Sequence, residues 1–357
     1  MPADAAAVAI RGAGPAGCAL ALLLRAQGTP LVLVGEPARA RPAFRPLALS
    51  HASRLILERV GAWAGLAPSP IRQVHVSQQG ALGRTSLTAA DAGVPSLGYV
   101  VDYADLLASL LERVAAAGLG PVPRMPEATT PQLVVHAEGT EDALPAKAYG
   151  QEAVVAIVST RPAASATAWE RFTPDGPLAL LPFGARHGLV WGMPPARAAE
   201  RCALPDAAFL AELQRAFGRR AGEFVAVEAR GRAPLALRVR RSRVGDRAAY
   251  IGNAAQTLHP VAGQGFNLAL RDAFDLAQVL QDAPDAGDAR LLARFDSVRR
   301  LDAAATVRVT DFLATGFLGG GALAPAIRGI GLSVLDICPP ARRFFARRMI
   351  YGASALP

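Results

Sequence analysis

The N-terminal segment holds a glycine-rich turn between an apolar strand pattern and an apolar helix pattern, and few folds can accommodate this arrangement. We predict a buried strand over Ala6–Ile10, the turn over Gly12–Gly17, a helix over Cys18–Ala26 and a second strand over Leu31–Val34, after which Glu36 follows. A G-x-G-x-x-G run in this position is typical of the first βαβ unit of a dinucleotide-binding domain. We therefore expect an α/β fold built on a Rossmann-like parallel sheet.

Each residue of this motif has an expected physical role. Gly12 permits the tight turn, Gly14 lets a pyrophosphate approach the backbone, and Gly17 lets the helix pack closely against the strand. Glu36 lies where an acid accepts hydrogen bonds from the ribose of adenosine. The motif predicts a bound dinucleotide, and by itself it does not distinguish FAD from NAD.

A second glycine-rich segment, Ile251–Asp272, indicates which of these two cofactors is bound. It reads I-G-N-A-A-Q-T-L-H-P-V-A-G-Q-G-F-N-L-A-L-R-D, a strand end and a loop before a helix that we expect to begin near Gly265. A helix N-terminus offers unpaired N–H groups and a positive dipole end, which suit a flat group that gains negative charge on reduction. A flavin fits this description, so FAD is the expected cofactor. The candidate cofactor-contacting residues here are Gly252, Asn253, Pro260, Gly263, Gln264, Gly265, Phe266 and Asn267.

Both segments resemble motifs of the class A FAD-dependent aromatic monooxygenases, the para-hydroxybenzoate hydroxylase-like family, and in particular its ubiquinone-biosynthesis branch of 2-octaprenyl-phenol-type hydroxylases. The runs R-P-L-A-L-S from Arg45 and E-R-F-T-P-D-G-P-L-A-L-L-P from Glu170 carry the same resemblance. The resemblance implies that Arg45 lies close to FAD. It also implies that Gly252 and Asn253 contact the ribityl–pyrophosphate part, while the loop from Pro260 lies along the isoalloxazine ring.

The resemblance further implies an activity. NAD(P)H would reduce FAD, molecular oxygen would add at flavin C4a, and the resulting hydroperoxide would hydroxylate a polyprenyl phenol in ubiquinone biosynthesis. This chemistry belongs to the cofactor and requires no nucleophile or metal from the protein. We accordingly identify no catalytic acid or base. The flavin-ring loop, with Pro260, Gly263, Gln264 and Gly265, is expected to stabilise negative charge on the reduced ring.

Two departures from the family pattern concern the NAD(P)H reaction. The run Ala137-Glu138-Gly139 stands where the family has Ala-Asp-Gly, and the segment Gly118–Gln132 is short and rich in proline. Two alternatives therefore remain open. One is a catalytically impaired FAD-binding member that serves as a subunit of a ubiquinone-biosynthesis assembly, and the other is an FAD oxidoreductase of the same superfold with a different reaction.

The order of the motifs predicts a discontinuous domain organisation. Residues 1–70, 98–145 and 245–300 are assigned to the FAD-binding domain, residues 71–97 and 146–244 to an antiparallel-sheet substrate domain, and residues 301–357 to a helical C-terminal region. We expect helices over Leu291–Val307 and Thr310–Phe317. In the substrate sheet the candidate pocket residues are Leu180, Pro182 and Phe183, for which an ordinary core position is an equally open interpretation.

Composition bounds the partners and the compartment. The 357 residues carry a formal net charge of +9, and four arginines lie between Arg342 and Arg348. Because the basic residues are not interleaved with aromatic ones on a nucleic-acid module, we expect no nucleic-acid partner. The three cysteines show no metal-binding or disulfide spacing, and no apolar run is long enough to span a bilayer. We expect a cytoplasmic protein, peripheral to a bacterial inner membrane, whose substrate is a small prenylated phenol.

Overall fold

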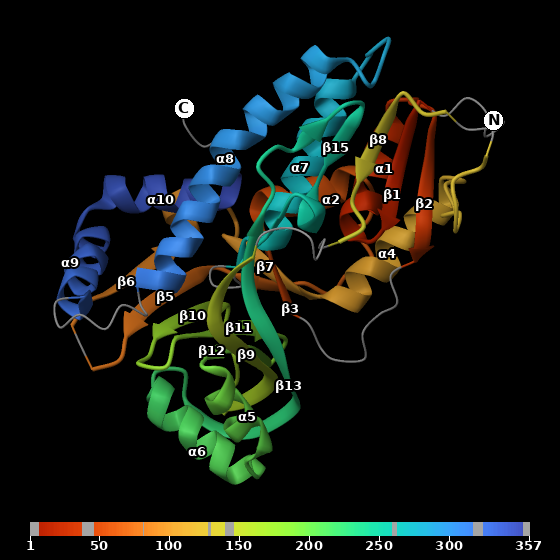
Figure 1. The fold of residues 1–357 in the computed structure, drawn as a ribbon. Coiled ribbons are helices and arrows are strands. Elements are labelled where there is room, and N and C mark those ends of the chain that lie inside the picture. The colour runs from red at the N-terminus through yellow and green to blue at the C-terminus, as the bar shows by residue number, and fades with distance from the viewer. Residues whose placement is uncertain are drawn as a thin grey trace.

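The computed structural model describes residues 7–37, 46–80, 82–127, 130–139, 146–258, 263–316 and 324–352. Figure 1 shows a parallel sheet with its helices at one end of the molecule and a larger sheet at the other. The long helix α8 runs along the side, and α9 and α10 lie at the edge next to strands β5 and β6. This arrangement confirms the expected α/β class with a Rossmann-like sheet, a second sheet and a helical C-terminus.

The first sheet has the strand order β14-β15-β8-β1-β2. Its strands are β1 (Val8–Ala13), β2 (Leu31–Pro37), β8 (Leu133–His136), β14 (Val244–Gly245) and β15 (Ala248–Tyr250). The pairs β1–β2, β1–β8 and β15–β8 are parallel, and only β14 at the edge runs antiparallel. Strand β1, between β8 and β2, is apolar from Val8 to Ile10 and completely buried there, as expected for an interior parallel strand.

Helix α1 (Pro15–Ala26) packs on this sheet, and α4 (Tyr103–Ala116) and α7 (Gly265–Leu280) pack against α1. Helix α1 begins earlier than the expected Cys18, because Pro15 has its backbone torsion preset for the first helical position. It ends before Gly28, which adopts a φ of 77° that other residues avoid. Helix α7 begins at Gly265 as predicted, and its small and apolar residues pack against α1 in one shared core.

The second sheet has eight strands in the order β16-β13-β9-β12-β11-β10-β5-β6. The strands are β5 (Gln73–Gln78), β6 (Arg84–Thr88), β9 (Ala146–Arg161), β10 (Thr167–Phe172), β11 (Pro177–Phe183), β12 (Arg186–Met193), β13 (Glu223–Val239) and β16 (Gln256–Thr257). All pairs are antiparallel except β10–β5. The turn before β11 is closed by backbone hydrogen bonds between Thr173 and Gly176.

One face of the second sheet is covered by α5 (Pro195–Ala203) and α6 (Asp206–Phe217). Trp191, Phe209 and Leu213 are completely buried in the cluster between these helices and the sheet. Strand β16 comes from the second glycine-rich segment, yet it hydrogen-bonds to β13 of this sheet. The backbone therefore ties the expected flavin-ring segment to the expected substrate sheet.

A small antiparallel sheet lies between the two larger ones (Figure 1). Its strands β3 (Pro46–Ser50), β7 (Gly98–Asp102) and β4 (Ser69–Ile71) stand in the order β3-β7-β4, with α2 (His51–Arg59) following β3 directly. Asp102 caps α4 by accepting a 2.7 Å hydrogen bond from the backbone N–H of Ala104. A short helix α3 (Ala89–Ala92) follows β6.

The C-terminal region contains α8 (Ala289–Gly316), α9 (Ala324–Ile337) and α10 (Pro339–Tyr351). The expectation of two separate helices over Leu291–Val307 and Thr310–Phe317 was wrong, because α8 is continuous from Ala289 to Gly316, and Phe317 lies outside the described residues. No proline or glycine interrupts the chain between Ala289 and Thr315, so the backbone has no reason to stop. The domain boundaries given above stay a prediction.

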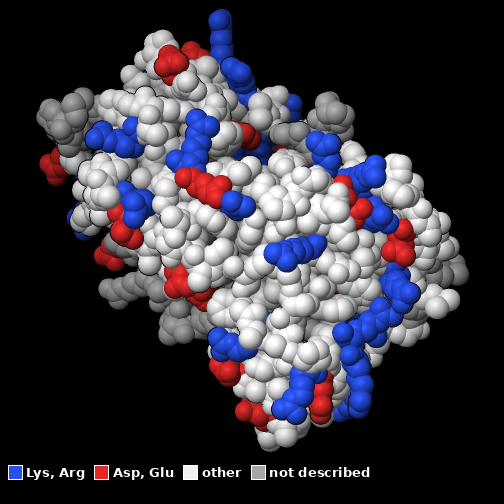
Figure 2. All heavy atoms as spheres, turned by 180° about the vertical axis from the view of Figure 1, so that it is seen from behind, with Lys and Arg blue, Asp and Glu red and all other residues white. Residues whose placement is uncertain are grey.

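Surface charge is spread over the molecule. Figure 2 shows basic and acidic side chains scattered over the face opposite to that of Figure 1, with uncharged surface between them. Within the described ranges, no helix combines the length and hydrophobicity that a bilayer crossing requires.

Candidate active site

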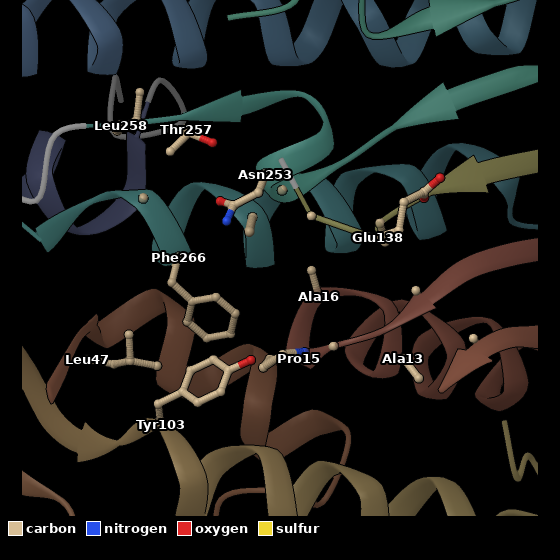
Figure 3. Close-up of a pocket in the computed structure, with 18 of the residues that line it drawn as sticks. Ala13, Pro15, Ala16, Leu47, Tyr103, Glu138, Asn253, Thr257, Leu258 and Phe266 are labelled. Carbon is tan, nitrogen blue, oxygen red and sulfur yellow. The ribbon is translucent and has the colours of Figure 1, made fainter. Parts of the chain in front are cut away.

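A cavity of about 710 Å³ opens where the three sheets approach one another. The β1–α1 turn and the end of β2 line one part, and β3 with the start of α4 lines another. The short helix η2 (Gly252–Ala254), the start of α7 and strands β11 and β12 complete the wall. Figure 3 shows that segments far apart in the sequence converge here. Both glycine-rich segments therefore face one cavity.

The three glycines of the first motif differ in what surrounds them. A side chain at Gly12 would lie 2.5 Å from the carbonyl of Ala137, the residue after β8, and one at Gly17 would lie 2.0 Å from the carbonyl oxygen of Gly12. A side chain at Gly14 would meet nothing within 4 Å. Gly12 and Gly17 are thus required by packing within the protein, whereas Gly14 leaves space on the cavity side.

Two helix N-termini open onto this cavity. Gly14 is the N-cap of α1 and Gln264 the N-cap of α7, and neither makes a side-chain capping hydrogen bond. Gly265, at the start of α7, likewise has no atom of the described residues within 4 Å of where a side chain would begin. Uncapped N–H groups and two positive dipole ends therefore face open space, which suits a ligand with an anionic pyrophosphate and a ring that gains negative charge.

Polar and aromatic side chains stand at other points of the wall. Glu36 is exposed at the end of β2, and Asn253 is exposed on η2. Figure 3 shows the rings of Phe266 from α7 and Tyr103 from α4 reaching toward one another near Pro15. An acid at the end of β2 is placed as a ribose-binding residue is placed in dinucleotide sites. Tyr103 was not among the residues singled out by sequence.

Asn267 lies behind the cavity wall. It is 1% exposed, and its Oδ1 accepts hydrogen bonds from the backbone N–H of Ser50 and the hydroxyl of Ser53, both at 2.7 Å. Its Nδ2 donates to the carbonyl oxygens of Ala48, at 2.9 Å, and Gly263, at 2.8 Å. All four hydrogen-bonding positions of this amide are used within the protein. Asn267 thus joins the start of α7 to β3 and α2, and fixes Gly263.

A buried charge network supports the other side of the wall. The Asp272 carboxylate accepts hydrogen bonds from the backbone N–H of Gly252, from Gln256 and from Arg299. Arg299 also pairs with Asp275 and Asp302. Burial acts to lower the pKa of Arg299, but the three carboxylates outweigh it and raise that pKa. A permanently charged arginine therefore holds Asp272, which in turn holds the Gly252 backbone beside the cavity.

Glu138, which replaces the aspartate of the family motif, lies on the cavity wall. Its carboxylate accepts a 2.8 Å hydrogen bond from Nδ1 of His136. The His136 ring stacks on the Tyr250 ring, with the two ring centroids 4.7 Å apart. The guanidinium carbon of Arg240 lies 3.7 Å from the centroid of the same Tyr250 ring. Burial acts to raise the pKa of Glu138, but hydrogen bonds from His136 and from the backbone outweigh it, so that pKa is lowered. Glu138 is therefore an ionised group at this point.

The second sheet contributes apolar side chains to the cavity. Leu181 on β11 and Val190 on β12 line it. Leu180 is completely buried in the cluster beneath α5 and α6, on the opposite face of β11, and Pro182 shares its side of the strand. Phe183 lies on the same side as Leu181, packed against the small cluster of Ile71, Val100 and Ala168. Alternate residues of β11 face opposite sides of the sheet, so the sequence could have identified Leu181 as a cavity residue only if the side facing the cavity had been known.

Glu170 lies on the cavity side of the same sheet. Its strand register sets it opposite Ala179, whose own partner on the next strand is Val190. Its Oε1 is completely buried and has no hydrogen-bond partner among the residues that the structure describes. Burial raises the pKa of Glu170 to about 8. The E-R-F run drew attention to this position in the sequence, but nothing there distinguished a buried acid from an exposed one.

Two sequence-based assignments fall outside the residues that the structure describes. Arg45 and Pro260 both lie in undescribed stretches, at 38–45 and 259–262. The described part of the chain holds no group of histidine, cysteine or acidic side chains that could bind a metal ion. The residues that are described fit FAD, because Gly14 and Gly265 each leave open space beside an uncapped helix N-terminus.

Comparison with known proteins agrees with this geometry. The family model described as "FAD binding domain" matches residues 5–124 and 126–310. The chain is 32% identical over 380 residues to the ubiquinone hydroxylase UbiL of Rhodospirillum rubrum, covering 95% of this chain and 88% of that protein. It is 29% identical to the 3-demethoxyubiquinol 3-hydroxylase of Escherichia coli over 371 residues, or 92% and 94% of the two chains.

The fold has also been seen in solved structures. The crystal structure of HpxO from Klebsiella pneumoniae, complexed with FAD and uric acid, superposes with a TM-score of 0.75 at 16% identity and covers 97% of each chain. At this identity the likeness concerns the fold. The resemblance noted from the sequence motifs is confirmed by the family match, which spans most of the chain. The chain therefore belongs to the FAD binding domain family and is an FAD-dependent monooxygenase.

Proposed function

We propose that this monooxygenase hydroxylates a phenol that carries an apolar polyprenyl tail, as a step of ubiquinone biosynthesis, with NAD(P)H and O2 as co-substrates. The observation that carries the proposal is the cavity itself, where a dinucleotide-type wall and the apolar residues Leu181 and Val190 face the same space. The names of the two bacterial relatives, both hydroxylases of ubiquinone or its precursors, point to the same substrate class.

The described residues would hold FAD in two groups. Gly12 and Gly14 with the start of α1 would receive the pyrophosphate, and Gly17 would serve this site by letting α1 pack closely on the turn. Glu36 would accept hydrogen bonds from the adenosine ribose. Gly252 and Asn253 on η2 would contact the ribityl part. Arg45 and Pro260 are proposed as further contacts on the sequence motif alone.

The remaining flavin-ring residues divide by position. Gly263, Gly265 and Phe266 line the cavity and would face the ring, while Gln264 occupies the N-cap position of α7 without a side-chain capping hydrogen bond and is buried. Asn267 would act indirectly, because it holds Gly263 in place and has no unused hydrogen-bonding position. FAD supplies the activation of oxygen, and the protein supplies the positive end of α7, the orientation of the ring and an apolar wall that excludes water.

For the substrate, Leu181 and Val190 are the proposed contacts, with Phe183 on the same side of β11. An apolar wall of this kind would accept a prenylated ring and would keep water away from the oxygen chemistry. Glu138 is proposed to accept hydrogen bonds from hydroxyl groups of the bound cofactor, because it is ionised and held by His136.

The test is a turnover experiment with the purified protein reconstituted with FAD. NADH and NADPH oxidation is followed with and without a short-chain prenylphenol, and the product is analysed by mass spectrometry. The proposal predicts substrate-stimulated oxidation and a product that has gained one oxygen atom. Bound flavin that is never reduced would support the subunit role instead. A product without added oxygen would support a different oxidoreductase reaction.

A further inference from the structure

Exposed apolar side chains gather at one edge of the molecule. Nine large apolar side chains are exposed in the part of the chain that the structure describes, and five of them lie on α9, α10 and the β5–β6 turn. We call these five residues the apolar edge: Leu82, Ile330, Val334, Ile337 and Phe344. Leu82 is 92% exposed and Ile337 78% exposed. Such a concentration on a water-soluble surface marks an interaction site.

The members on α9 and the β5–β6 turn form one surface. Ile330, Val334 and Ile337 follow each other at helical spacing, so they share one side of α9. The β5–β6 turn packs tightly against the same helix, because a side chain at Gly329 would lie 2.4 Å from the carbonyl oxygen of Leu82. The amide of Gln78 donates a hydrogen bond to that carbonyl. Leu82 is therefore held beside α9 rather than placed there by chance.

Basic residues border this surface on α10. Arg343 and Arg347 are exposed on the same side of the helix as Phe344, while Ala346 and Ile350 face the core. Arg342 joins α10 to the rest of the protein through Asp91, at 2.9 Å, and through the carbonyl oxygen of Asp336, at 2.7 Å. Between residues 329 and 352 the chain has four arginines and one acid, Asp336. The surface is therefore both apolar and positively charged.

We propose that the apolar edge docks on a membrane surface that contains anionic lipid. Apolar side chains would enter the boundary between headgroups and acyl chains, and Arg343 and Arg347 would lie against the negative headgroups. A second copy of this chain is a poorer occupant, because its identical edge would bring arginines against arginines. Charge complementarity thus selects the lipid surface over self-association.

The position of the edge agrees with a substrate that carries an apolar tail. Helix α9 packs on β5 and β6, which belong to the same sheet as the cavity-lining strands β11 and β12. Figure 1 shows α9 and α10 next to β5 and β6, away from the parallel sheet that contains β1 and β2. Delivery of a tailed substrate rests on the proposed function, whereas the docking surface does not, because membrane binding needs no turnover.

The test is co-sedimentation of the full-length FAD-loaded protein with vesicles, without any phenol or NAD(P)H. Vesicles of phosphatidylcholine alone are compared with vesicles that also contain phosphatidylglycerol, at low and at high salt. We expect binding to the anionic vesicles that is weakened by salt. The double variant Arg343→Glu with Arg347→Glu should bind at least about tenfold more weakly, since each basic residue contributes separately. The double variant Val334→Asp with Ile337→Asp should also lose binding.

Matched controls change the same properties elsewhere. Arg290→Glu with Arg294→Glu, both exposed on α8, alters net charge equally and should leave binding within about twofold. Leu55→Asp with Val225→Asp introduces the same acids at exposed apolar positions outside the edge. Thermal unfolding and bound-flavin content verify that each variant is folded.

The proposal is overturned if the wild-type protein does not bind anionic vesicles at low salt, if the edge variants bind as wild type does, or if both control pairs lose binding equally. A dimer that Ile337→Asp dissociates would likewise overturn it in favour of self-association.

Discussion

The side-chain Oδ1 of Asn267, in the first turn of α7, accepts a 2.7 Å hydrogen bond from the backbone N–H of Ser50, 217 residues earlier in the chain. This contact closes the cavity wall between the second glycine-rich segment and the small sheet. The same amide also fixes Gly263 through its carbonyl oxygen. One buried side chain thus sets the distance between two segments that both line the proposed FAD site.

Replacement of Asn267 by alanine should therefore impair stability and FAD binding together. The buried N–H of Ser50 and the carbonyls of Ala48 and Gly263 would lose their partner, which should lower the free energy of unfolding by roughly 2–4 kcal/mol. Urea unfolding of the apo-protein measures this. Asn253→Ala, which removes an exposed amide on the cavity, is the control and should leave apo-protein stability within about 0.5 kcal/mol. Equal stability losses in both variants would contradict the assigned role of Asn267.

Substitutions at two glycines of the first motif should have different effects, one on FAD binding and the other on the stability of the fold. Gly14→Val adds a side chain where no protein atom lies within 4 Å, so the apo-protein should remain as stable as wild type while FAD affinity falls at least tenfold. Gly17→Ala places a methyl group 2.0 Å from the carbonyl oxygen of Gly12 and should destabilise the fold itself. Thermal unfolding and flavin fluorescence titration measure the two effects. A Gly14→Val protein that binds FAD normally would show that the cavity is used differently.

Glu36→Gln should weaken FAD binding without altering the fold. A hydrogen bond to a charged acceptor contributes about 1.5–3 kcal/mol, so its loss should raise the dissociation constant by roughly 10- to 100-fold. Because Glu36 is exposed at the end of β2, thermal unfolding of the apo-protein should not change. Titration with FAD and with FMN, which lacks the adenosine, tests the position directly. The variant should lose affinity for FAD only, and an equal loss for FMN would speak against a ribose contact.

The buried charge network makes a prediction about stability. Asp272→Asn leaves Arg299 with one partner fewer and should lower the free energy of unfolding by about 3–5 kcal/mol. The backbone N–H of Gly252 depends on the same carboxylate, so FAD binding should suffer as well. Glu228→Gln breaks a surface pair with Arg186 and serves as the comparison, with an expected effect below about 1 kcal/mol. Similar unfolding curves for the two variants would refute a structural role for Asp272.

Glu170 predicts a pH dependence with a definite sign. Its pKa in the folded protein is raised to about 8 from an ordinary value of 4.5, so the folded state favours the protonated carboxyl. Its contribution to stability is fully present below about pH 4.5 and is lost as the pH rises toward 8, at up to about 1.4 kcal/mol per pH unit. Glu170→Gln should therefore lose less stability than wild type over this range. The free energy of unfolding is measured by urea unfolding from pH 4.5 to 8. The control variant Glu223→Gln, which changes an exposed acid, should lose as much stability over this range as wild type does.

Much of this architecture could be predicted from local sequence. The G-x-G-x-x-G run placed α1 and β2, and the start of α7 at Gly265 followed from the second glycine-rich segment. These predictions succeeded because glycine, proline and apolar periodicity act over a few residues. The extent of α8 was missed because a break was expected where no helix-breaking residue stands.

The site was harder to predict than the elements around it. Which face of β11 meets the cavity depends on how the second sheet sits against the first, so Leu181 could not be told from Leu180 by sequence. Three of the four hydrogen bonds of Asn267 reach partners more than two hundred residues away in the chain, and no local pattern encodes those three. The parallel pairing of β10 with β5 likewise joins strands far apart in the sequence, so local sequence patterns do not predict it.

The most direct test of the account is an FAD titration of the purified apo-protein, followed by the visible spectrum and by flavin fluorescence. If the helix N-termini at Gly14 and Gly265 form one cofactor site, wild type should take up one FAD per chain. The double variant Gly14→Val with Gly265→Val should remain folded and take up essentially none. A folded wild-type protein that stays colourless after incubation with FAD would contradict the account.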